Sequence, residues 1–536
     1  MSNKFDLLIK SGRVIDGTGN PYFKADIGIS GGRIALIARD IDPAAAEKTL
    51  SADTLTVCPG FIDTHSHDDV YLLSNPRCDE KILQGVTTNV IGNCGISVSP
   101  VSKAHSAEMN SFLAVMCGQQ VSTEALNFHT FGDYLAKLES LKPGMNVLPL
   151  VGHSTVRIAA MGAANRAPSE TELKEMTGHV AHAMEEGAFG LSTGLIYAPS
   201  NYARTEELLE LAKVAGRFHG IYTTHMRSEG DAEPAAIEEA LRIGREAGIP
   251  VHISHHKVLG KENWGKSVDT LKRMAEARNQ GLEVTCDQYP YRAGSTFLAA
   301  VLPPAVLAGG PAVFTGKLKD KSFRAQVVET IERGSAPGWE NLIKGAGFDG
   351  LVISVSEHED YVGKSVADIA KREKKTPYDV IFDLVAEESL GCIIILFMMD
   401  EADITRIMRN AWTMIGSDGI PGFGVKKVHP RMSGTFPRIL GRYVREQGVL
   451  TLEEAIRKMT SLSAQTFGAR GKGLLKEGFD ADVVVFDPAT VQDLATYEEP
   501  NQGPVGIRYV LVNGEIAAQD GKVTGATSGK VLRHSM

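Results

Sequence analysis

Short apolar segments separated by glycine-rich turns make up both ends of the chain. Near the N-terminus they lie at 6–9, 13–16, 26–30 and 33–37. Near the C-terminus they lie at 481–486, 507–512 and 515–518. Apolar or alternating runs bounded by Gly and Asn-Gly are typical of β-hairpins. We therefore expect both ends to be β-rich and to form one small β-sandwich domain together.

The middle of the chain repeats a different unit, in which an apolar strand leads into a polar loop and then an amphipathic helix. The predicted strands lie at 56–63, 87–92, 146–151, 188–191, 221–224, 250–254, 282–286 and 412–416. The clearest helices, with an apolar period near 3.6 residues, are at 170–186, 205–219 and 234–246. Eight successive units of this kind predict an α/β fold, a (β/α)8 TIM-like barrel.

Two further apolar runs, at 351–356 and 392–399, lie between the seventh and eighth predicted strands. We interpret residues 309–410 as an insertion before the last strand, with the alternative that one of these runs supplies a barrel strand. The predicted organisation is a barrel domain over 56–475. The small β domain takes its N-terminal part from 1–55 and its C-terminal part from 476–536.

Composition narrows the class of function. The 536 residues, 43% of them hydrophobic, are enough for a large barrel and a small domain. The net charge of −9 and the lack of a basic run argue against a nucleic-acid partner. We expect no membrane partner, because no apolar run is long enough to span a bilayer. The six cysteines lack a framework spacing and the N-terminus lacks a signal peptide, so we expect a cytoplasmic protein.

Two histidines follow the first predicted barrel strand. His65 and His67 are two residues apart, so in an extended segment both side chains point to the same side. Imidazole is the commonest protein ligand for zinc. A bare His-x-His is more often a pair of solvated loop residues, but this one follows an apolar strand and precedes two aspartates. We therefore interpret the pair as metal ligands.

Further candidate ligands follow other predicted strands. Cys94, His225 and His255 come directly after the second, fifth and sixth strands, and Asp418 comes after the eighth. In a closed barrel all these strand ends share one face, and the eighth strand neighbours the first. Histidine and cysteine are zinc ligands. Asp418 beside a metal could take a proton from water and pass it to a leaving amine. Each residue alone would more often be structural, so the prediction rests on their convergence.

Two more histidines leave alternatives open. His256 is adjacent to His255, and only one of the two side chains can face the centre of the barrel. His153 follows the third predicted strand and is either a ligand, a residue that fixes its loop, or neither.

The segment Pro59-Gly60-Phe61-Ile62-Asp63-Thr64-His65-Ser66-His67 resembles the first-strand signature of the amidohydrolase superfamily. Over nearly its whole length the chain is more closely similar to the N-acyl-D-amino acid deacylases, also called D-aminoacylases. The motifs that carry this similarity are His65-Ser66-His67-Asp68-Asp69, Gly92-Asn93-Cys94-Gly95, Thr224-His225-Met226-Arg227, Ser254-His255-His256-Lys257 and Gly416-Ser417-Asp418-Gly419. The resemblance implies a hydrolase that cleaves the amide of an N-acyl-D-amino acid.

The resemblance also implies the metal chemistry. Cys94, His225 and His255 would hold one tight zinc ion. His65 and His67, sharing Cys94, would form a second and weaker metal site. Asp418 would be the proton shuttle, and water the nucleophile.

Substrate contacts are implied as well. The α-carboxylate would be bound by a Lys, a Tyr and an Arg, for which the matching positions are Lys257, Tyr289 and Arg431. Tyr197 would hold the scissile carbonyl oxygen. The choice among Tyr289, Tyr291 and Arg292 stays open.

The small-molecule substrate is otherwise only partly defined by the sequence. The apolar stretch Ser295–Pro303 is expected to line the pocket and favours neutral D-side chains. A dipeptidase or cyclic-amide hydrolase with the same site is the alternative enzyme, and substrate profiling separates them. A non-catalytic barrel used as a scaffold is the alternative from another class, and metal analysis tests it.

Overall fold

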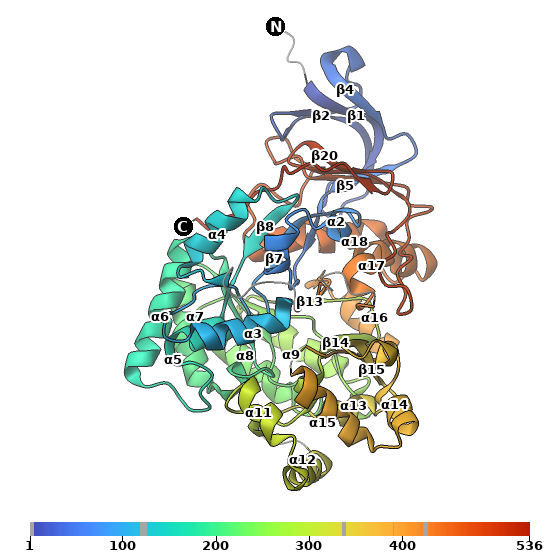
Figure 1. Cartoon of the computed structure of the whole chain (residues 1–536). Helices are drawn as coiled ribbons and strands as arrows, with labels where there is room; N and C mark the ends of the chain where they lie inside the picture. Colours follow the sequence, from blue (N-terminus) through green and yellow to red (C-terminus); the bar gives the residue numbers. More distant parts are fainter. Residues whose placement is uncertain (1–4, 118–125, 335–338, 390, 422–426, 536) are drawn as a thin grey trace.

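The computed structural model describes residues 5–117, 126–334, 339–389, 391–421 and 427–535. A barrel of parallel strands and surrounding helices lies between a sheet built from both ends of the chain and an insertion at the other end (Figure 1). Among the described residues, no helix is both long and apolar enough to cross a membrane.

The terminal sheet joins strands from the two ends of the chain, in the order β21-β20-β19-β18-β5-β1-β2-β3, with β4 also on β1. Its N-terminal strands are β1 (Phe5–Val14), β2 (Phe23–Ser30), β3 (Arg33–Ala38), β4 (Ala46–Ser51) and β5 (Thr56–Pro59). Its C-terminal strands are β18 (Val483–Phe486), β19 (Ile507–Val512), β20 (Glu515–Gln519) and β21 (Lys522–Val523). Asn513 and Gly514, between β19 and β20, both have positive φ, as a tight hairpin requires.

The barrel strands run in parallel. They are β6 (Phe61–Asp63), β7 (Val86–Ile91), β8 (Asn146–Pro149), β9 (Val151–Gly152), β10 (Gly190–Gly194), β11 (Ile221–His225), β12 (Val251–Ile253), β13 (Val284–Gln288) and β17 (Thr413–Ile415). With β8 and β9 as one interrupted strand, the described residues supply the expected eight positions. A bridge between Ser66 and Gly419 brings the ends of β6 and β17 together and closes the barrel. The predicted fold is confirmed.

The first predicted strand is in fact two strands. Residues 56–63 are divided into β5, which pairs with β1 and β18 in the terminal sheet, and β6, which pairs with β7 in the barrel. The chain changes sheets at Gly60, where a Cβ atom would lie 2.1 Å from the hydroxyl oxygen of Thr87. The prediction of one continuous barrel strand was therefore wrong, because a period-2 apolar run does not show which sheet it enters.

Amphipathic helices follow the barrel strands. They include α3 (Ser106–Cys117), α4 (Phe131–Ser140), α5 (His153–Met161), α6 (Glu170–Glu185), α7 (Thr205–Arg217), α8 (Glu233–Ala247), α9 (Ser267–Asn279), α16 (Glu401–Arg409), α17 (Arg431–Arg438) and α18 (Leu452–Met459). In α6, Ser169 and Glu172 form a capping box that satisfies free amides of the first turn, and Met176 and Val180 are buried on the inner face. Local sequence therefore sets both the start and the orientation of this helix.

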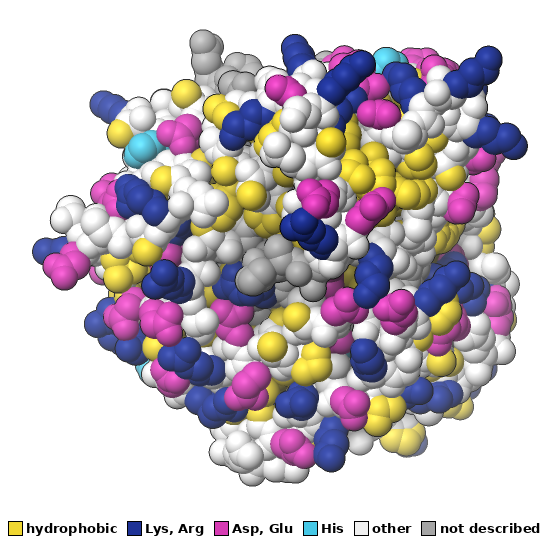
Figure 2. Space-filling view, turned by 90° about the horizontal axis from the view of Figure 1, so that it is seen from below, with side chains coloured by type: hydrophobic (Ala, Val, Ile, Leu, Met, Phe, Trp, Pro, Cys, Tyr) yellow, Lys and Arg dark blue, Asp and Glu magenta, His cyan; other side chains and the backbone are white. Residues whose placement is uncertain are grey.

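The insertion begins earlier than the predicted residue 309, because β14 pairs with β16 in an antiparallel sheet of the order β14-β16-β15. Its elements are β14 (Ala293–Phe297), α10 (Pro304–Leu307), α11 (Pro311–Lys317), α12 (Lys321–Arg333), α13 (Leu342–Ala346), β15 (Leu351–Val355), α14 (Val366–Glu373), α15 (Pro377–Glu388) and β16 (Ile393–Phe397). Because β17 pairs directly with β13, neither apolar run supplies a barrel strand. On the face seen from below Figure 1, charged side chains of both signs surround patches of hydrophobic side chains (Figure 2).

Candidate active site

The thiol of Cys94 lies among three imidazoles at the mouth of the barrel, the face where the strands have their carboxyl ends. Its Sγ is 3.3 Å from Nε2 of His65, 3.4 Å from Nε2 of His255 and 3.7 Å from Nδ1 of His225. The loop that presents it needs glycine, since a Cβ at Gly92 would lie 2.0 Å from the carbonyl oxygen of Leu150. The structure thus brings together four of the predicted metal ligands, which follow β6, β7, β11 and β12.

A second group overlaps the first. Oδ1 of Asp418 lies 3.2 Å from Nε2 of His67 and 3.6 Å from Nε2 of His65. Backbone bonds fix this arrangement: the amide of Asp418 donates to the carbonyl of His65, and the amide of His67 donates to that of Gly419. Asp418 has φ of +50°, so the tight turn after β17 aims its carboxylate back at the two histidines.

The residues fit a zinc centre. In a tetrahedral site with Zn–S of about 2.3 Å and Zn–N of about 2.0–2.1 Å, ligand atoms lie roughly 3.5 Å apart. The contacts of the Cys94 sulfur span 3.3 to 3.7 Å, in agreement with that spacing. Burial lowers the pKa of His65 and His225 well below the usual range, which keeps both imidazoles neutral and able to bind metal. Burial raises the pKa of the Cys94 thiol, so a bound cation is what would hold it as thiolate.

Two buried carboxylates that the sequence reasoning missed orient the histidines. Oε1 of Glu229 is 2.9 Å from Nδ1 of His255, and Oε2 is 3.7 Å from Nε2 of His225. Asp287 accepts a hydrogen bond from the backbone amide of His255 and another from the hydroxyl of Thr64. A carboxylate placed as Glu229 is fixes the ring orientation of metal-binding histidines, whereas Asp287 holds the backbone of His255. Asp287 directly follows the predicted strand at 282–286, and this position was a signal in the sequence, although β13 extends to Gln288. Glu229 lies in a loop, and its position gave no signal.

A buried lysine, also missed, joins the first and last barrel strands. Nζ of Lys81 lies 2.5 Å from Oδ2 of Asp63 and 2.6 Å from Oγ of Ser417, and Lys81 is fully buried. Ser417 in turn donates its backbone amide to Oδ1 of Asp63. These contacts hold the residue before Asp418 against the end of β6.

Three of the predicted substrate-binding residues gather around one ring. The guanidinium of Arg431 lies 4.8 Å, and Nζ of Lys257 lies 5.3 Å, from the centre of the Tyr289 ring. Tyr291 instead stacks under Arg438, and Arg292 is exposed, so Tyr289 is the one of the three that faces the centre. Both cations also contact carboxylates of the site.

Those ion pairs are short. Nη1 of Arg431 lies 2.7 Å from Oδ2 of Asp418, and Nζ of Lys257 lies 2.7 Å from Oε1 of Glu229. Burial alone would raise the pKa of Asp418, but Arg431 and the neighbouring imidazoles of His255 and His67 outweigh it and hold that pKa well below its usual range. Asp418 is therefore ionised and able to accept a proton.

Of the remaining sequence candidates, Tyr197 lies next to a proposed metal ligand, whereas His153 has a structural role. The ring of Tyr197 packs edge-on against the ring of His225 at 5.1 Å. His153 bonds Oγ of Ser200 and Oε1 of Glu207, so it fixes the loop that carries Tyr197.

His256 points away from the centre. Its Nε2 bonds the hydroxyl of Thr270, and its Nδ1 is 3.6 Å from Glu233. Of the two adjacent histidines, His255 is the one that faces the Cys94 sulfur.

Comparison with known proteins gives matches over almost the whole chain. A family model described as the amidohydrolase family matches residues 48–316 and 361–518. A D-aminoacylase of Alcaligenes xylosoxydans xylosoxydans is 40% identical over 531 residues, which is 99% of this chain and 98% of that protein.

Solved structures agree with this. One of them is a D-aminoacylase structure that addresses the functional role of the binuclear metal centre in that enzyme. It superposes with a TM-score of 0.84, at 38% identity over 99% of this chain and 100% of that one. An N-acyl-D-glutamate deacylase of Bordetella bronchiseptica, complexed with zinc and a phosphonate inhibitor that mimics the tetrahedral intermediate, superposes with a TM-score of 0.83. Its identity is 38%, over 99% of this chain and 100% of that one.

Proposed function

Because this chain belongs to the amidohydrolase family, we propose that its barrel mouth carries out zinc-dependent hydrolysis of N-acyl-D-amino acids, releasing a carboxylate and a free D-amino acid. The observation that carries the proposal is the group of ligand atoms around Cys94 with the ionised Asp418 beside it. Relatives with this activity match nearly the whole length of the chain.

We assign the metal to named residues. Cys94, His225 and His255 would hold the tight zinc ion, and His65 and His67, sharing Cys94, the second, weaker site. Bound zinc supplies Lewis acidity, which polarises the scissile carbonyl and makes water a competent nucleophile. Glu229 would keep the ring of His255 in the orientation that presents Nε2 to the metal.

Asp418 would be the proton shuttle. Its carboxylate is buried, ionised and within hydrogen-bond range of His67. It would accept the proton of the attacking water and deliver it to the leaving amine, so no covalent acyl-enzyme is needed.

Lys257, Tyr289 and Arg431 would bind the α-carboxylate, and Tyr197 the scissile carbonyl oxygen. The two cations lie close to the same ring, and a guanidinium can bind a carboxylate through two parallel donors. Their present carboxylate partners are part of the site, so an incoming substrate carboxylate competes for cations that are already positioned.

The organisation and location of the protein are proposals of the same kind. We propose that the small domain comprises residues 1–59 and 476–536 and the barrel residues 60–475, with a cytoplasmic location; this moves the expected boundary between residues 55 and 56 to the change of sheets at Gly60. The five cysteines with described side chains are all buried and free, which supports a reducing compartment.

The test is a parallel assay of N-acetyl-D- and N-acetyl-L-amino acids with zinc quantified in the same preparation. We expect turnover of the D series only, in proportion to bound zinc. A dipeptide and a cyclic amide serve as controls, and turnover of these in place of the D series would contradict the proposal. An N-acetyl-D-amino amide, which lacks the carboxylate, should be a much poorer substrate than the matching acid.

A further inference from the structure

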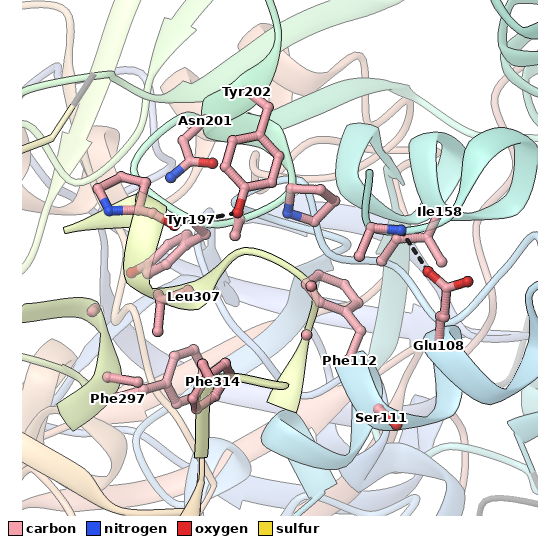
Figure 3. A pocket seen from close by; sticks show the side chains of 18 of the residues that line it. Glu108, Ser111, Phe112, Ile158, Tyr197, Asn201, Tyr202, Phe297, Leu307 and Phe314 are labelled. Atoms are coloured by element: carbon pink, nitrogen blue, oxygen red, sulfur yellow. Dashed lines mark hydrogen bonds between the residues drawn. The ribbon is translucent and has the colours of Figure 1, made fainter. Parts of the chain in front are cut away.

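A cavity of about 310 Å³ lies beside the metal centre, between the barrel mouth and the beginning of the insertion (Figure 3). Most of its wall is apolar. The largest apolar side chains in it are Ile96, Phe112, Ile158, Phe297, Leu307 and Phe314. Nothing in the proposed mechanism uses this space.

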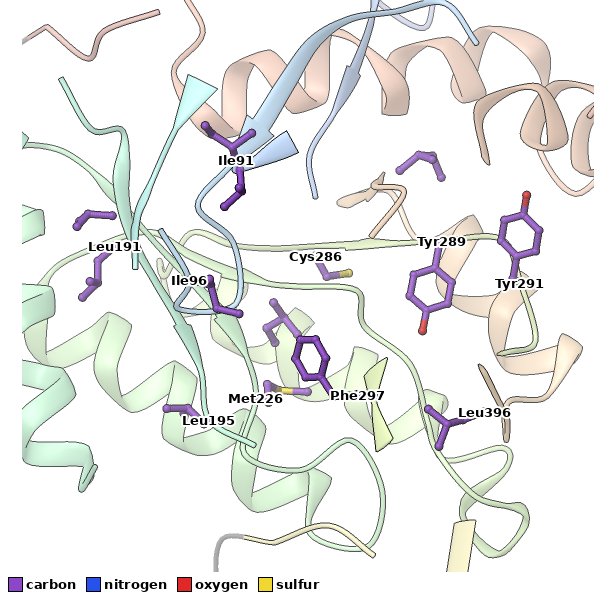
Figure 4. Close-up of a cluster of buried hydrophobic side chains, with 14 of the residues drawn as sticks. Ile91, Ile96, Leu191, Leu195, Met226, Cys286, Tyr289, Tyr291, Phe297 and Leu396 are labelled. Carbon is purple, nitrogen blue, oxygen red and sulfur yellow. The ribbon is translucent and has the colours of Figure 1, made fainter. Parts of the chain in front are cut away.

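The inner wall of the cavity adjoins the metal centre through neighbours of two proposed metal ligands. Ile96 is two residues beyond Cys94 on the same loop. Tyr197, which also lines the cavity, packs its ring against His225 at 5.1 Å and lies 6.2 Å from Phe297. Ile96 and Phe297 belong to one buried hydrophobic cluster with Met226, the residue after His225 (Figure 4). A group that leaves the metal centre past Tyr197 therefore enters apolar surroundings.

The cavity offers no cation to an acidic ligand. Among the described residues that line it there is no Lys, Arg or His, and Glu108 is the charged side chain. The carboxylate of Glu108 is already engaged, since it accepts a hydrogen bond from the amide of Ala163 (Figure 3). It also lies 3.1 Å from Nδ1 of His105. Burying the carboxylate of a ligand in this cavity without a cationic partner would cost free energy, so an uncharged apolar group is the ligand that fits.

The part of the cavity wall carried by barrel strands lies across the barrel from the proposed carboxylate-binding residues, and the outer wall comes from residues 297–314, at the end of β14 and after it. The strand order places β7 opposite β12, β9 opposite β13, and β10 opposite β17. Lys257, Tyr289 and Arg431 follow β12, β13 and β17. Ile96 follows β7, Ile158 is in the helix after β9, and Tyr197 follows β10.

We propose that this cavity binds the acyl chain of the substrate, and that the preferred acyl group is a medium-length aliphatic or an aromatic one rather than acetyl. The inference rests on the proposed function. In an N-acyl amino acid the α-carboxylate and the acyl chain are at opposite ends, with the scissile carbonyl between them. With the carboxylate at Tyr289 and the carbonyl at the metal, the chain extends toward Tyr197 and Ile96. The amino acid side chain branches from Cα, on the carboxylate side. Residues 297–302, which the sequence indicated as lining for a neutral D-side chain, would then contact the acyl chain instead.

The volume sets the size of the acyl group. The cavity of about 310 Å³ is far larger than the space that one water molecule needs, so it has room for a group much larger than a methyl. An acetyl methyl group would leave most of it unfilled. Octanoyl and phenylacetyl groups are of the right size. Burial of each added methylene is expected to raise kcat/KM by about fourfold until the cavity is full.

Two isomeric substrates separate the acyl chain from the side chain. N-octanoyl-D-alanine and N-acetyl-D-2-aminononanoic acid contain the same atoms, but the long chain is on the carbonyl in the first and on Cα in the second. On the zinc-loaded full chain we expect kcat/KM to be at least about tenfold higher for the octanoyl isomer. Equal values, or preference for the aminononanoic isomer, would overturn the inference and assign the cavity to the side chain.

A cavity-filling variant locates the effect. Ala300 is half-buried in the cavity wall, and Ala300→Trp should reduce the preference for the octanoyl isomer by about tenfold or more. Ala386→Trp, at a half-buried position in α15 that does not line the cavity, is the matched control and should keep the preference. An unchanged preference in Ala300→Trp would contradict the assignment.

Octanoate binding gives a readout that does not need turnover. By calorimetry we expect the zinc-loaded protein to bind octanoate at least about tenfold more tightly than acetate, and Ala300→Trp to lose that difference. If neither isomer nor N-acetyl-D-alanine is hydrolysed, the proposed function fails, and this titration alone then decides whether the cavity binds acyl chains. Equal affinity for the two fatty acids overturns the inference whatever the activity.

Discussion

The guanidinium of Arg431 lies 2.7 Å from the carboxylate of Asp418, and both side chains are buried at the barrel mouth. The sequence indicated Arg431 only as a residue that binds the α-carboxylate of the substrate. The ion pair adds a second task, because the same cation lowers the pKa of the proposed proton shuttle. Arg431 would then act on both binding and proton transfer.

The first prediction concerns the acid side of the pH profile. Arg431 stabilises the charged form of Asp418, so its removal should raise the pKa of that carboxyl group. A shuttle that must be ionised is active above its pKa, so Arg431→Met should move the acid limb of kcat/KM to higher pH. Arg438→Met, on the same helix but paired with Asp493, is the control and should leave the limb in place. An unmoved limb in Arg431→Met would show that the ion pair does not set this pKa.

The second prediction isolates proton transfer. Asp418→Asn keeps the shape of the side chain and removes its basicity. Zinc content should be retained, while kcat falls by roughly 10²-fold or more, the scale of losing a general base. Zinc analysis accompanies the kinetics, because simultaneous loss of metal would make Asp418 chiefly a ligand. Normal turnover with an unchanged pH profile would remove it from the mechanism.

The third prediction concerns the thiolate. Cys94 contacts three of the proposed histidine ligands, so Cys94→Ala should lose most of the bound zinc and nearly all activity. Cys58→Ala is the control, since Cys58 is equally buried but lies in β5 of the terminal sheet. Metal content is measured after dialysis of both variants. Stoichiometric zinc in Cys94→Ala would rule out the cysteine ligand.

The fourth prediction tests the orienting carboxylate. Glu229→Gln should weaken zinc affinity by about 10–100-fold, because the amide no longer holds His255 as a charged acceptor does. Competition with a chromogenic chelator measures the affinity without any turnover. Glu233→Gln, a buried carboxylate beside His256, is the matched control and should bind zinc normally. Equal affinities for the two variants would leave Glu229 without a role in the metal site.

The fifth prediction concerns the contact between the first and last strands. Lys81→Met leaves Asp63 buried without its cation, which should lower the free energy of unfolding by about 3–5 kcal/mol. Thermal unfolding of the zinc-free protein checks this apart from any effect of metal. The double variant Lys81→Met/Asp63→Asn should recover part of the loss. Full stability of Lys81→Met would show that the ion pair contributes little.

The sequence predicted the barrel and much of the site because those features are local. A polar residue directly after an apolar strand is visible in the chain, and Cys94, His225, His255 and Asp418 all have that position. Because alternate side chains of an extended segment point to the same side, the sequence also placed His65 and His67 together. The direction of each strand and its polar end were therefore enough to indicate the ligands.

What the sequence did not show depends on contacts between distant segments. Lys81 is a surface-type residue in a short helix, and only the closed barrel pairs it with Asp63 and Ser417. Glu229 acquires its role because the loop after β11 folds against His255. In the sequence Gly60 looks like part of one continuous strand. Only the close approach of Thr87 in the folded chain shows that the backbone passes from one sheet to the other at this glycine.

The bridge between the ends of β6 and β17 has a consequence for synthesis of the chain. Cys94, His225 and His255 are all synthesised well before Asp418. The terminal sheet is also incomplete until β18 pairs with β5. A nascent chain could thus gather the three zinc ligands before it has its proton shuttle. Zinc taken up at that stage would be held by an inactive centre, and hydrolytic competence would begin only when the final barrel strand closes.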